Sequence, residues 1–417
     1  MALASGRSID DQSAVFHGEV QYRKSFSGER SRVIAGASIR ESQVDTKGTL
    51  VEPQSDSRSD KYYGAYTQLE YDIATPVRVL VAARWDASNL YETQFSPRAG
   101  VVFSPTREHA FRVTVNKAFL VPSQVEFFLN IPAGVQNLLP LETGLRASPL
   151  GPALAGVPNG ALFTTSTSVP VLARGNPTLV PERLTSYEVG YKGQISGRFY
   201  VTVDGFYNRV RDFVTSLLPA TAVNPAFQRW TAPPQVPAAA RAPLENAVRQ
   251  ALAGTTAEFG LTRLANGNTA IVVSYGNAGE VNQWGAELGA AVSVSQSLQL
   301  SGSYALFDFD VQSAQAGDVL EPNTPKHKGT VSLAYDGPQG FEFGVTARAS
   351  TGYQWAAGVY RGFIPASQFV NVNAAYQVNE KLRIHAVATN VFNQQRFQIF
   401  GGSVIGRRVL AGVTATL

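Results

Sequence analysis

The chain has 417 residues, of which 44% are hydrophobic and 16% are charged, and its formal net charge is +4. It lacks cysteine, which excludes disulfides, zinc fingers and thiol catalysis, and it lacks the run of about 18 apolar residues that a membrane-spanning helix needs. Its Lys and Arg residues are scattered and form no basic block, so the charge pattern does not indicate nucleic-acid binding.

Strands are predicted along most of the chain. The first is expected near Val15 to Phe26. After it, apolar residues recur at every second position with polar residues between them, which is typical of strands that have one apolar face. The clearest runs of this kind are 65–73, 77–86, 111–116, 341–350, 370–378 and 408–417.

The connections between the predicted strands alternate between short and long. Tight turns are expected at 196–197, 296–297, 337–340 and 379–381, followed by the strands 198–214, 298–311, 341–352 and 382–392. The long polar connections are 43–60, 120–181, 215–268, 312–325 and 354–367. We expect these to be irregular, apart from one helical patch at 244–252 that ends before Gly254. A membrane barrel has this asymmetry, because its tight turns face the periplasm and its longer loops face outward.

Two fold classes produce such alternation, a soluble β-sandwich and a membrane β-barrel. The predicted runs reach about 11–16 residues, which suits membrane-spanning strands of roughly 9–11 residues better than the soluble average of about 5–6. Aromatic residues lie near the strand ends, where they would form a girdle at the membrane interface: Tyr62, Tyr63, Trp85, Tyr91, Tyr207, Trp284, Tyr304, Tyr335, Tyr353 and Trp355. We therefore predict an all-β fold, an antiparallel transmembrane β-barrel with long extracellular loops.

The direction of the strands indicates whether the chain contains all the strands of a closed barrel. We count about fifteen strands, and the tight turns share one side with Leu417 at the end of the chain. The first and last strands would then both run toward the periplasm, whereas a closed barrel from a single bacterial chain has an even number of strands. Residues 1–7 also lack the basic start and apolar stretch of a signal peptide. We therefore expect the chain to be a fragment whose first strands precede residue 1.

Several motifs occur in a fixed order over about 320 residues. They are the segments 96–105 (SPRAGVVFSP), 116–123 (NKAFLVPS), 175–182 (GNPTLVPE) with 186–190 (SYEVG), 277–279 with 284–288, 325–328 (PKHK), 390–393 (NVFN) and 406–413 (GRRVLAGV). In this order they resemble the barrel signature of TonB-dependent receptors. Lys117 and Leu120 depart from the usual pattern of their segment, and Leu417 stands where the family usually ends in an aromatic residue.

The resemblance implies that residues 1–417 are the C-terminal portion of a 22-stranded receptor barrel, with about 15 of its strands and without the N-terminal plug or TonB box. It implies an outer-membrane receptor that takes up a scarce ligand, an iron chelate, cobalamin or a saccharide, with energy relayed by TonB. The partners implied are that small extracellular ligand, outer-membrane lipid and lipopolysaccharide, and TonB through the missing N-terminal region. The alternatives are a passive porin-like channel, an outer-membrane enzyme, and a soluble β-sandwich or adhesin.

No catalytic, metal or cofactor residue is assigned, and the protein is not expected to be an enzyme. The four histidines, His17, His109, His327 and His385, show no ligand spacing, and His385 is expected on the lumen wall with Arg383. No GxSxG elbow is present, and residues 401–406 lack the Lys-Ser/Thr ending of a phosphate loop.

Two groups of residues remain as candidates for binding. Asp308 and Asp310 share a strand face near Asp318 and Glu321, so they form either a cation site in the vestibule or an acidic strand end. In the two longest loops, six residues could stack on or pair with a ligand: Phe127, Phe128, Arg146, Phe227, Arg229 and Trp230. Packing inside the loops is the favoured interpretation for most of them, so no ligand-binding residue is assigned.

Overall fold

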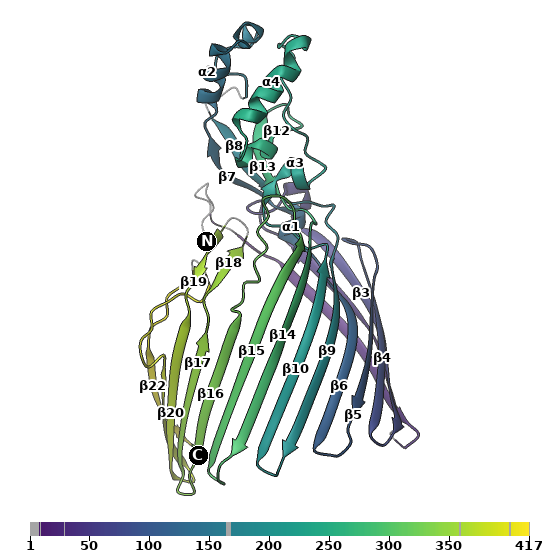
Figure 1. Ribbon diagram of the computed structural model, residues 1–417, viewed down its shortest axis with the longest axis vertical. Helices are drawn as coiled ribbons and strands as arrows, with labels where there is room; N and C mark the ends of the chain where they lie inside the picture. Colours follow the sequence, from purple (N-terminus) through teal and green to yellow (C-terminus); the bar gives the residue numbers. More distant parts are fainter. Residues whose placement is uncertain are drawn as a thin grey trace.

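The computed structural model describes residue 8 and residues 10–28, 30–163, 168–357, 360–399 and 402–416. A 15-stranded antiparallel sheet curves into a barrel wall, with β1 at one end of the strand order and β22 at the other (Figure 1). Its strands are β1 (Ala14–Phe26), β2 (Ser31–Val44), β3 (Arg58–Ala74), β4 (Val77–Ser88), β5 (Gln94–Phe103), β6 (His109–Leu120), β9 (Glu182–Ile195), β10 (Phe199–Arg211), β14 (Glu280–Ser293), β15 (Leu298–Ser313), β16 (His327–Asp336), β17 (Phe341–Ser350), β20 (Ser367–Asn379), β21 (Leu382–Thr389) and β22 (Arg408–Ala415). The predicted barrel fold and its strand number are confirmed.

The two-residue period of the sequence sets the two faces of the wall. In β3, Leu69 and Ile73 lie on the outer face and are 47% and 57% exposed. Asp60 and Glu70 lie on the inner face and are buried. Apolar side chains therefore lie on the outer face of the wall and polar ones face the lumen, as the alternation predicts.

Six of the ten aromatic residues predicted to form a girdle lie on the outer face: Tyr63, Trp85, Tyr207, Trp284, Tyr304 and Tyr335. The prediction is wrong for Tyr62 and Tyr91, whose rings pack together at 6.3 Å on the inner side of the rim. It is also wrong for Tyr353, which lines the lumen. Tyr62 lies within β3 and shares the inner face with Asp60 and Gly64, as the two-residue period requires, whereas Tyr91 stands in a loop and Tyr353 at a strand end, where sequence spacing does not fix the face of a side chain.

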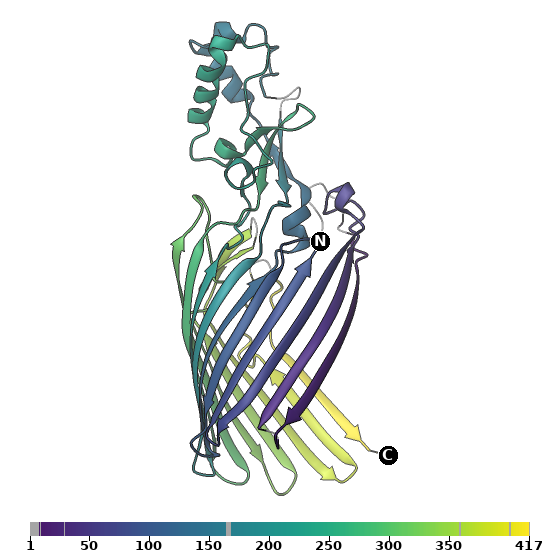
Figure 2. The same cartoon turned by 90° about the vertical axis from the view of Figure 1, so that its right-hand side faces the viewer.

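The tight turns and the long connections lie at opposite ends of the barrel. The short turns follow β1, β3, β5, β9, β14, β16 and β20. The C-terminal end of the described chain lies at the same end as these turns, and the start of β1 lies at the other (Figure 2). The predicted asymmetry and strand directions are thus confirmed.

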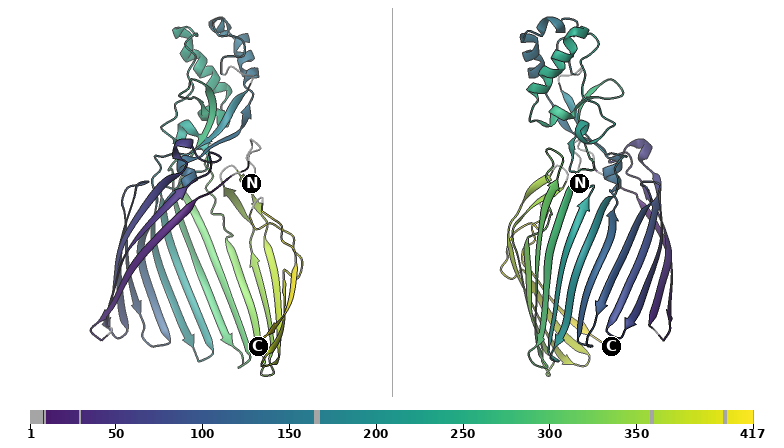
Figure 3. Two further views of the ribbon diagram at one scale, coloured as in Figure 1. Left: turned by 180° about the vertical axis from the view of Figure 1, so that it is seen from behind. Right: turned by 45° about the vertical axis from the view of Figure 1, so that its right-hand side comes forward.

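The two longest connections differ from the prediction. Instead of irregular loops, they form together one folded unit, here called the extension, which stands above the barrel (Figures 1 and 3). Its elements are α1 (Gln124–Phe128), β7 (Asn130–Gln136), α2 (Leu139–Ala147), η2 (Gly151–Leu154), β8 (Val169–Arg174), β11 (Leu218–Pro219), α3 (Ala220–Val223), α4 (Ala238–Ala251), α5 (Thr256–Gly260), β12 (Leu261–Arg263) and β13 (Thr269–Ser274). Of these elements the sequence anticipates only α4, through the helical patch at 244–252.

The extension is held together by pairing between the two connections. β8 of the first connection pairs in parallel with β13 of the second, in the order β11-β13-β8-β7, and β12 joins β13. A shared core of buried side chains, including Leu154, Leu162 and Leu244, completes the unit. Neither connection could bury these side chains alone, which explains why each looks irregular in isolation.

The motif segment at residues 175–176 and Asn277 join the extension to the barrel. Gly175 passes so close to Phe127 that a Cβ atom would lie 2.4 Å from its backbone, so only glycine fits. Asn176 donates from Nδ2 to the Tyr275 carbonyl at 2.9 Å, and Asn277 donates from Nδ2 to the Val180 and Asp212 carbonyls at 2.9 and 2.7 Å. The side chains of Asn176 and Asn277 therefore have a structural role: their hydrogen bonds hold the extension against the barrel.

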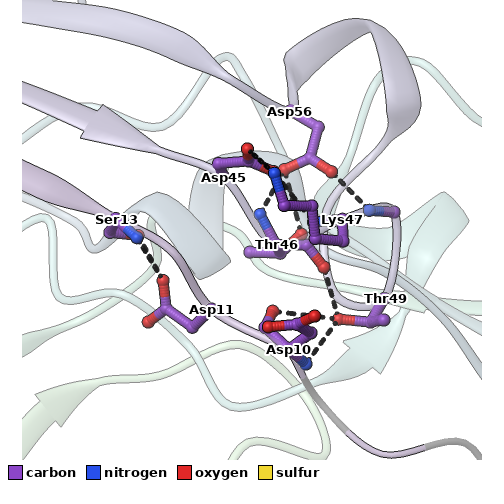
Figure 4. Close-up of polar contacts among 9 residues, drawn as sticks. Asp10, Asp11, Ser13, Asp45, Thr46, Lys47, Thr49 and Asp56 are labelled. Atoms are coloured by element: carbon purple, nitrogen blue, oxygen red, sulfur yellow. Dashed lines mark hydrogen bonds and ion pairs between the residues drawn. The ribbon is translucent and has the colours of Figure 1, made fainter.

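The remaining loops are smaller. β18 (Tyr353–Ala357) and β19 (Tyr360–Ile364) form a hairpin between β17 and β20, and η1 (Pro53–Ser55) lies between β2 and β3. In that β2–β3 loop, Asp56 accepts hydrogen bonds from the backbone amides of Thr46 and Gly48 (Figure 4). Lys47 donates to Asp45 and thereby lowers the pKa of that carboxyl. None of the helices in the described residues is long and apolar enough to cross a membrane.

Candidate ligand-binding site

A hollow of about 690 Å³ opens on the inner face of the wall, and we call it the lumenal hollow. β10, β14, β15, β16, β17 and β20 supply its wall, and the segments after β17 and β21 supply Tyr353, Arg396 and Gln398. Lys328 is the second residue of β16, Ser350 ends β17 and Ser367 begins β20. The hollow therefore reaches the loop ends of β16, β17 and β20, whereas Thr202, the fourth residue of β10, extends it toward the turn end of that strand.

Positive charge dominates this hollow. Lys328 and Arg348 line the hollow and are both exposed. No carboxylate among the described residues lies within ion-pair distance of either. Glu287 also lines the hollow and has no ion pair within the described part of the chain. Asp204 is already neutralised, because Arg112 Nη2 donates to its Oδ1 at 2.9 Å. The unpaired charges favour an anionic occupant.

Arg396 adds a cation above an aromatic ring. Its guanidinium carbon lies 5.6 Å from the centroid of Phe369, and its Nη1 donates to the Pro365 carbonyl. Its Nε is buried and has no hydrogen-bond partner in the described part of the chain. Tyr353, which also lines the hollow, donates from its hydroxyl to the Gln398 carbonyl at 3.3 Å. Arginine beside aromatic rings suits a ligand that combines negative charge with flat groups.

The six loop residues considered for ligand contact are used inside the extension instead. Phe127, Phe128 and Trp230 are buried, with 1%, 8% and 6% of their surface exposed. Phe227 packs against the cluster of Ala220, Ala270 and Val272, and Arg229 lies 4.5 Å over the ring of Phe259. The packing interpretation therefore describes all of them except Arg146, which has a polar role.

Arg146 ties the first half of the extension together. It pairs with the buried Glu142 one helical turn earlier and donates to the carbonyls of Leu154, Val157 and Pro158 at 3.1, 2.9 and 2.9 Å. Glu142 in turn accepts from the amides of Gly160 and Leu162. Every charged atom in this network has a partner inside the extension, so it offers none to a ligand.

The acidic candidates do not form a cation site. Asp308 and Asp310 do share a face, but it is the outer face, where Asp308 pairs with Lys326 Nζ at 2.6 Å. Asp318 accepts from Ser216 in another loop. No group of three or more His, Asp or Glu in the described ranges has metal-binding geometry. The vestibule interpretation is therefore wrong, because β15 turns these carboxylates away from the lumen.

The other sequence candidates are placed as follows. His385 and Arg383 lie on the inner face, as predicted, and Arg383 pairs with Glu342 at 2.5 Å. Residues 402–406 precede β22 without helical structure, whereas Gly401 lies outside the described residues, as do Leu417 and residues 1–7.

The residues of the lumenal hollow are not recognisable as a group from the sequence. Arg348 stands at a polar position of a predicted strand, so the alternation places it on the inner face. Lys328 lies in the motif segment 325–328, for which the alternation predicts no face. Nothing in the sequence indicates that Arg396, from the connection before β22, folds over Phe369.

Two tyrosines near the loops have a raised pKa. Burial raises the pKa of both Tyr91 and Tyr275 to about 12.

Solved structures of similar fold include two receptors and an iron transporter. The siderophore receptor PirA from Pseudomonas aeruginosa is 12% identical, with a TM-score of 0.59 over 97% of this chain and 57% of that one. A point mutant of the ferric enterobactin receptor PfeA from the same organism is 13% identical, with a TM-score of 0.62 over 97% and 54%. The FrpB iron transporter from Neisseria meningitidis is 14% identical, with a TM-score of 0.61 over 97% and 55%.

The chain thus spans little more than half the length of these receptors. The sequence profile of the family "TonB dependent receptor-like, beta-barrel" matches residues 6–393. Members of that family are outer-membrane transporters and not enzymes. With its fifteen paired strands, its outward apolar face and its ordered motifs, the chain belongs to the TonB-dependent receptor-like β-barrel family of the bacterial outer membrane.

Proposed function

We propose that this barrel serves the uptake of an anionic iron chelate through the outer membrane, with energy relayed by TonB. The observation that carries the proposal is the lumenal hollow, where Lys328 and Arg348 have no acidic partner among the described residues and Arg396 lies over Phe369. Unpaired cations that line one concave surface attract an anion, because their fields add inside the hollow.

The choice among ligand classes follows from this charge. The proteins of similar fold include receptors named for siderophores and for ferric enterobactin, and an iron transporter. A neutral saccharide would be recognised by hydrogen-bonding and stacking groups and would leave the cations of the hollow unpaired. An iron chelate with carboxylate or catecholate groups uses both the cations and the aromatic rings.

Two further partners belong to this proposal. TonB would act through the N-terminal region of such receptors, and the outer face of the barrel would be surrounded by outer-membrane lipid and lipopolysaccharide. The chemistry would consist of binding and gating, without a covalent step.

The proposal is tested with outer membranes from cells that make residues 1–417 joined to the N-terminal region of such a receptor. We expect Lys328→Ala with Arg348→Ala to weaken the binding of a ferric catecholate or ferric citrate chelate about 10- to 30-fold, since each lost charge-assisted contact is worth about 1 kcal/mol. Binding is measured by quenching of protein fluorescence, and uptake by transport of radiolabelled iron. Arg23→Ala is the matched control, because it removes an inner-face cation from β1, a strand that supplies no residue to the hollow.

Unchanged affinity in the double variant would contradict an anionic ligand in this hollow. Iron uptake that persists in cells without TonB would contradict the energy source and would indicate the passive channel instead. Steady open conductance in a planar bilayer is the complementary measurement for that alternative.

A further inference from the structure

A second hollow on the inner face of the wall adjoins the lumenal hollow. It has a volume of about 330 Å³, and we call it the exit hollow. Thr202 and Asp204 line both hollows, so the two share a border on β10. Ala110 is the second residue of β6 and Lys192 is the fourth from the end of β9, and both line the exit hollow. This hollow therefore lies near the turn end of the barrel.

One row of paired residues on the inner face joins the two hollows. Directly paired residues on neighbouring strands lie side by side, so their side chains form a continuous line across the wall. We call this line the wall track, and its members in order are Arg348, Thr330, Ser303, Gly289, Thr202 and Lys192.

The wall track runs from the loop end of the barrel to its turn end. Arg348 is the third residue from the loop end of β17, whereas Lys192 lies near the turn end of β9. The slope follows from the tilt of the strands, because a row that crosses tilted strands changes height at each step (Figure 1). Five strand spacings separate Arg348 from Lys192, which corresponds to about 24 Å at about 4.8 Å each.

Small side chains form the wall track between its two end residues. None of them is larger than threonine, and three of the four carry a hydroxyl group. On the loop side of the track, by contrast, Phe206 of β10 and Phe307 of β15 project from the inner face, with their ring centroids 6.4 Å apart. The track therefore offers a solute both room and hydrogen-bonding groups along this part of the wall.

Cations without an acidic partner stand at both ends of the wall track. Arg348 belongs to the lumenal hollow, and Lys192 is exposed and forms no ion pair with a described residue. Asp204 and Glu287 lie between them in the adjacent row, and only Asp204 is neutralised, by Arg112. An anion is thus attracted at each end and is not retained in between. Passage through a pore requires such binding, which is favourable enough for entry and weak enough for departure.

From this arrangement we infer that the wall track is the route by which an anionic chelate leaves the lumenal hollow, with Lys192 as its last binding position before the periplasm. Lys192 acts on release rather than on first binding, because it lines the exit hollow and not the lumenal hollow. The inference rests on the proposed uptake function, since it concerns the passage of the same ligand after it has bound.

The experiment separates binding from passage in the joined protein that tests the proposed function, with ferric citrate and a ferric catecholate as probes. Lys192→Glu should lower the maximal rate of iron uptake by cells about tenfold, because a repelling group replaces an attracting one at the exit. The affinity measured by fluorescence quenching should not change. Arg23→Glu is the matched control, since Arg23 lies on the inner face at the same distance from the turn end, on β1, and lines neither hollow.

A second pair of variants tests the width of the route. Ala110→Phe fills the exit hollow and should lower the uptake rate without a change in affinity. Ala334→Phe places the same ring on the inner face near the turn end of β16, outside both hollows, and should leave uptake unchanged. Lys192→Arg keeps the positive charge and should retain uptake, and heat-modifiable migration on gels shows whether each variant has folded.

Undiminished uptake in Lys192→Glu and Ala110→Phe would overturn the inference, as would an equal loss of uptake in the two controls. Weaker chelate binding in Lys192→Glu would also overturn it, because Lys192 would then belong to the binding site. All these results leave the proposed uptake function standing. Absence of chelate binding to the unsubstituted protein would instead contradict that function, and this inference with it, so the two failures are distinguishable.

Discussion

Residues of the family motifs act mainly through backbone contacts and amide groups. Gly175 is required by the close approach of Phe127, and Asn176 and Asn277 each bind carbonyl groups of distant segments. The sequence marks these positions clearly, but their spacing does not say what they touch. The residues of the lumenal hollow are the reverse case. Arg348 and Arg396 stand in ordinary sequence contexts, and the motif that contains Lys328 does not indicate that the curved wall brings the three cations together.

Tyr275 should make the stability of the extension depend on pH. It packs against the clusters around Phe127 and Leu129, and burial raises its pKa to about 12 from an ordinary value of 10. Because ionisation of a phenol in the folded state is disfavoured, the associated stability is complete below pH 10 and is lost as the pH rises from 10 to about 12. The loss is about 2–3 kcal/mol for a shift of this size.

We expect the extension to open reversibly in this alkaline range, which hydrogen exchange of residues 121–181 and 212–279 would detect. The ultraviolet absorbance of phenolate should show a late-titrating group that disappears in Tyr275→Phe, while Tyr91 keeps its own late titration. An identical absorbance titration in Tyr275→Phe would contradict the assignment.

Local sequence patterns predict the strands of the barrel wall but not those of the extension. The strands of the wall could be predicted because each pairs with a neighbour through a repeated register, and the period of two survives over more than ten residues, as in β3. The extension could not, because β8 and β13 pair in parallel across about 100 residues of chain, and β12 has only three residues. Short strands whose partners lie far away carry no distinctive period.

The core of the extension should be sensitive to the loss of a single buried side chain. Leu244 of α4 is 1% exposed and contributes to the cluster that joins both connections. Leu244→Ala should destabilise the extension by about 2–5 kcal/mol, because it removes buried contacts and leaves a cavity. Limited proteolysis should then cleave residues 121–181 and 212–279 while the barrel strands stay protected.

The exposed Asn246 on the same helix provides the control for this change. Asn246→Ala should alter proteolysis little, since surface substitutions usually change stability by less than about 0.5 kcal/mol. Equal resistance of the Leu244→Ala and Asn246→Ala proteins would show that the core does not hold the extension together.

For the whole molecule, the ends of the sheet matter most. In the described structure β1 pairs only with β2 and β22 only with β21, so each leaves one row of backbone groups without a strand partner. Overall strand number and direction were predictable, because the alternation of turns and loops is a property of the entire chain. The curvature that brings side chains of the inner face together could not be predicted from the sequence.

We expect residues 1–417, produced alone, to aggregate or to be degraded, because unpaired strand edges template intermolecular pairing. Fractionation of cells that express only this chain is the measurement, with sedimentation of the detergent extract as a second readout. Recovery of a heat-modifiable, detergent-folded monomer would contradict the expectation and would show that the two edges can be satisfied within one chain.

The parallel ladder between β8 and β13 also constrains how such receptors can diversify. Because each connection completes the fold of the other, an insertion or deletion in residues 121–181 must be matched by a change in residues 212–279. A chimaera that exchanges only one connection with another receptor would lack the partner strand of that connection, so the two segments have to be exchanged together. For the same reason, substitutions in the two segments should be correlated among descendants of this protein.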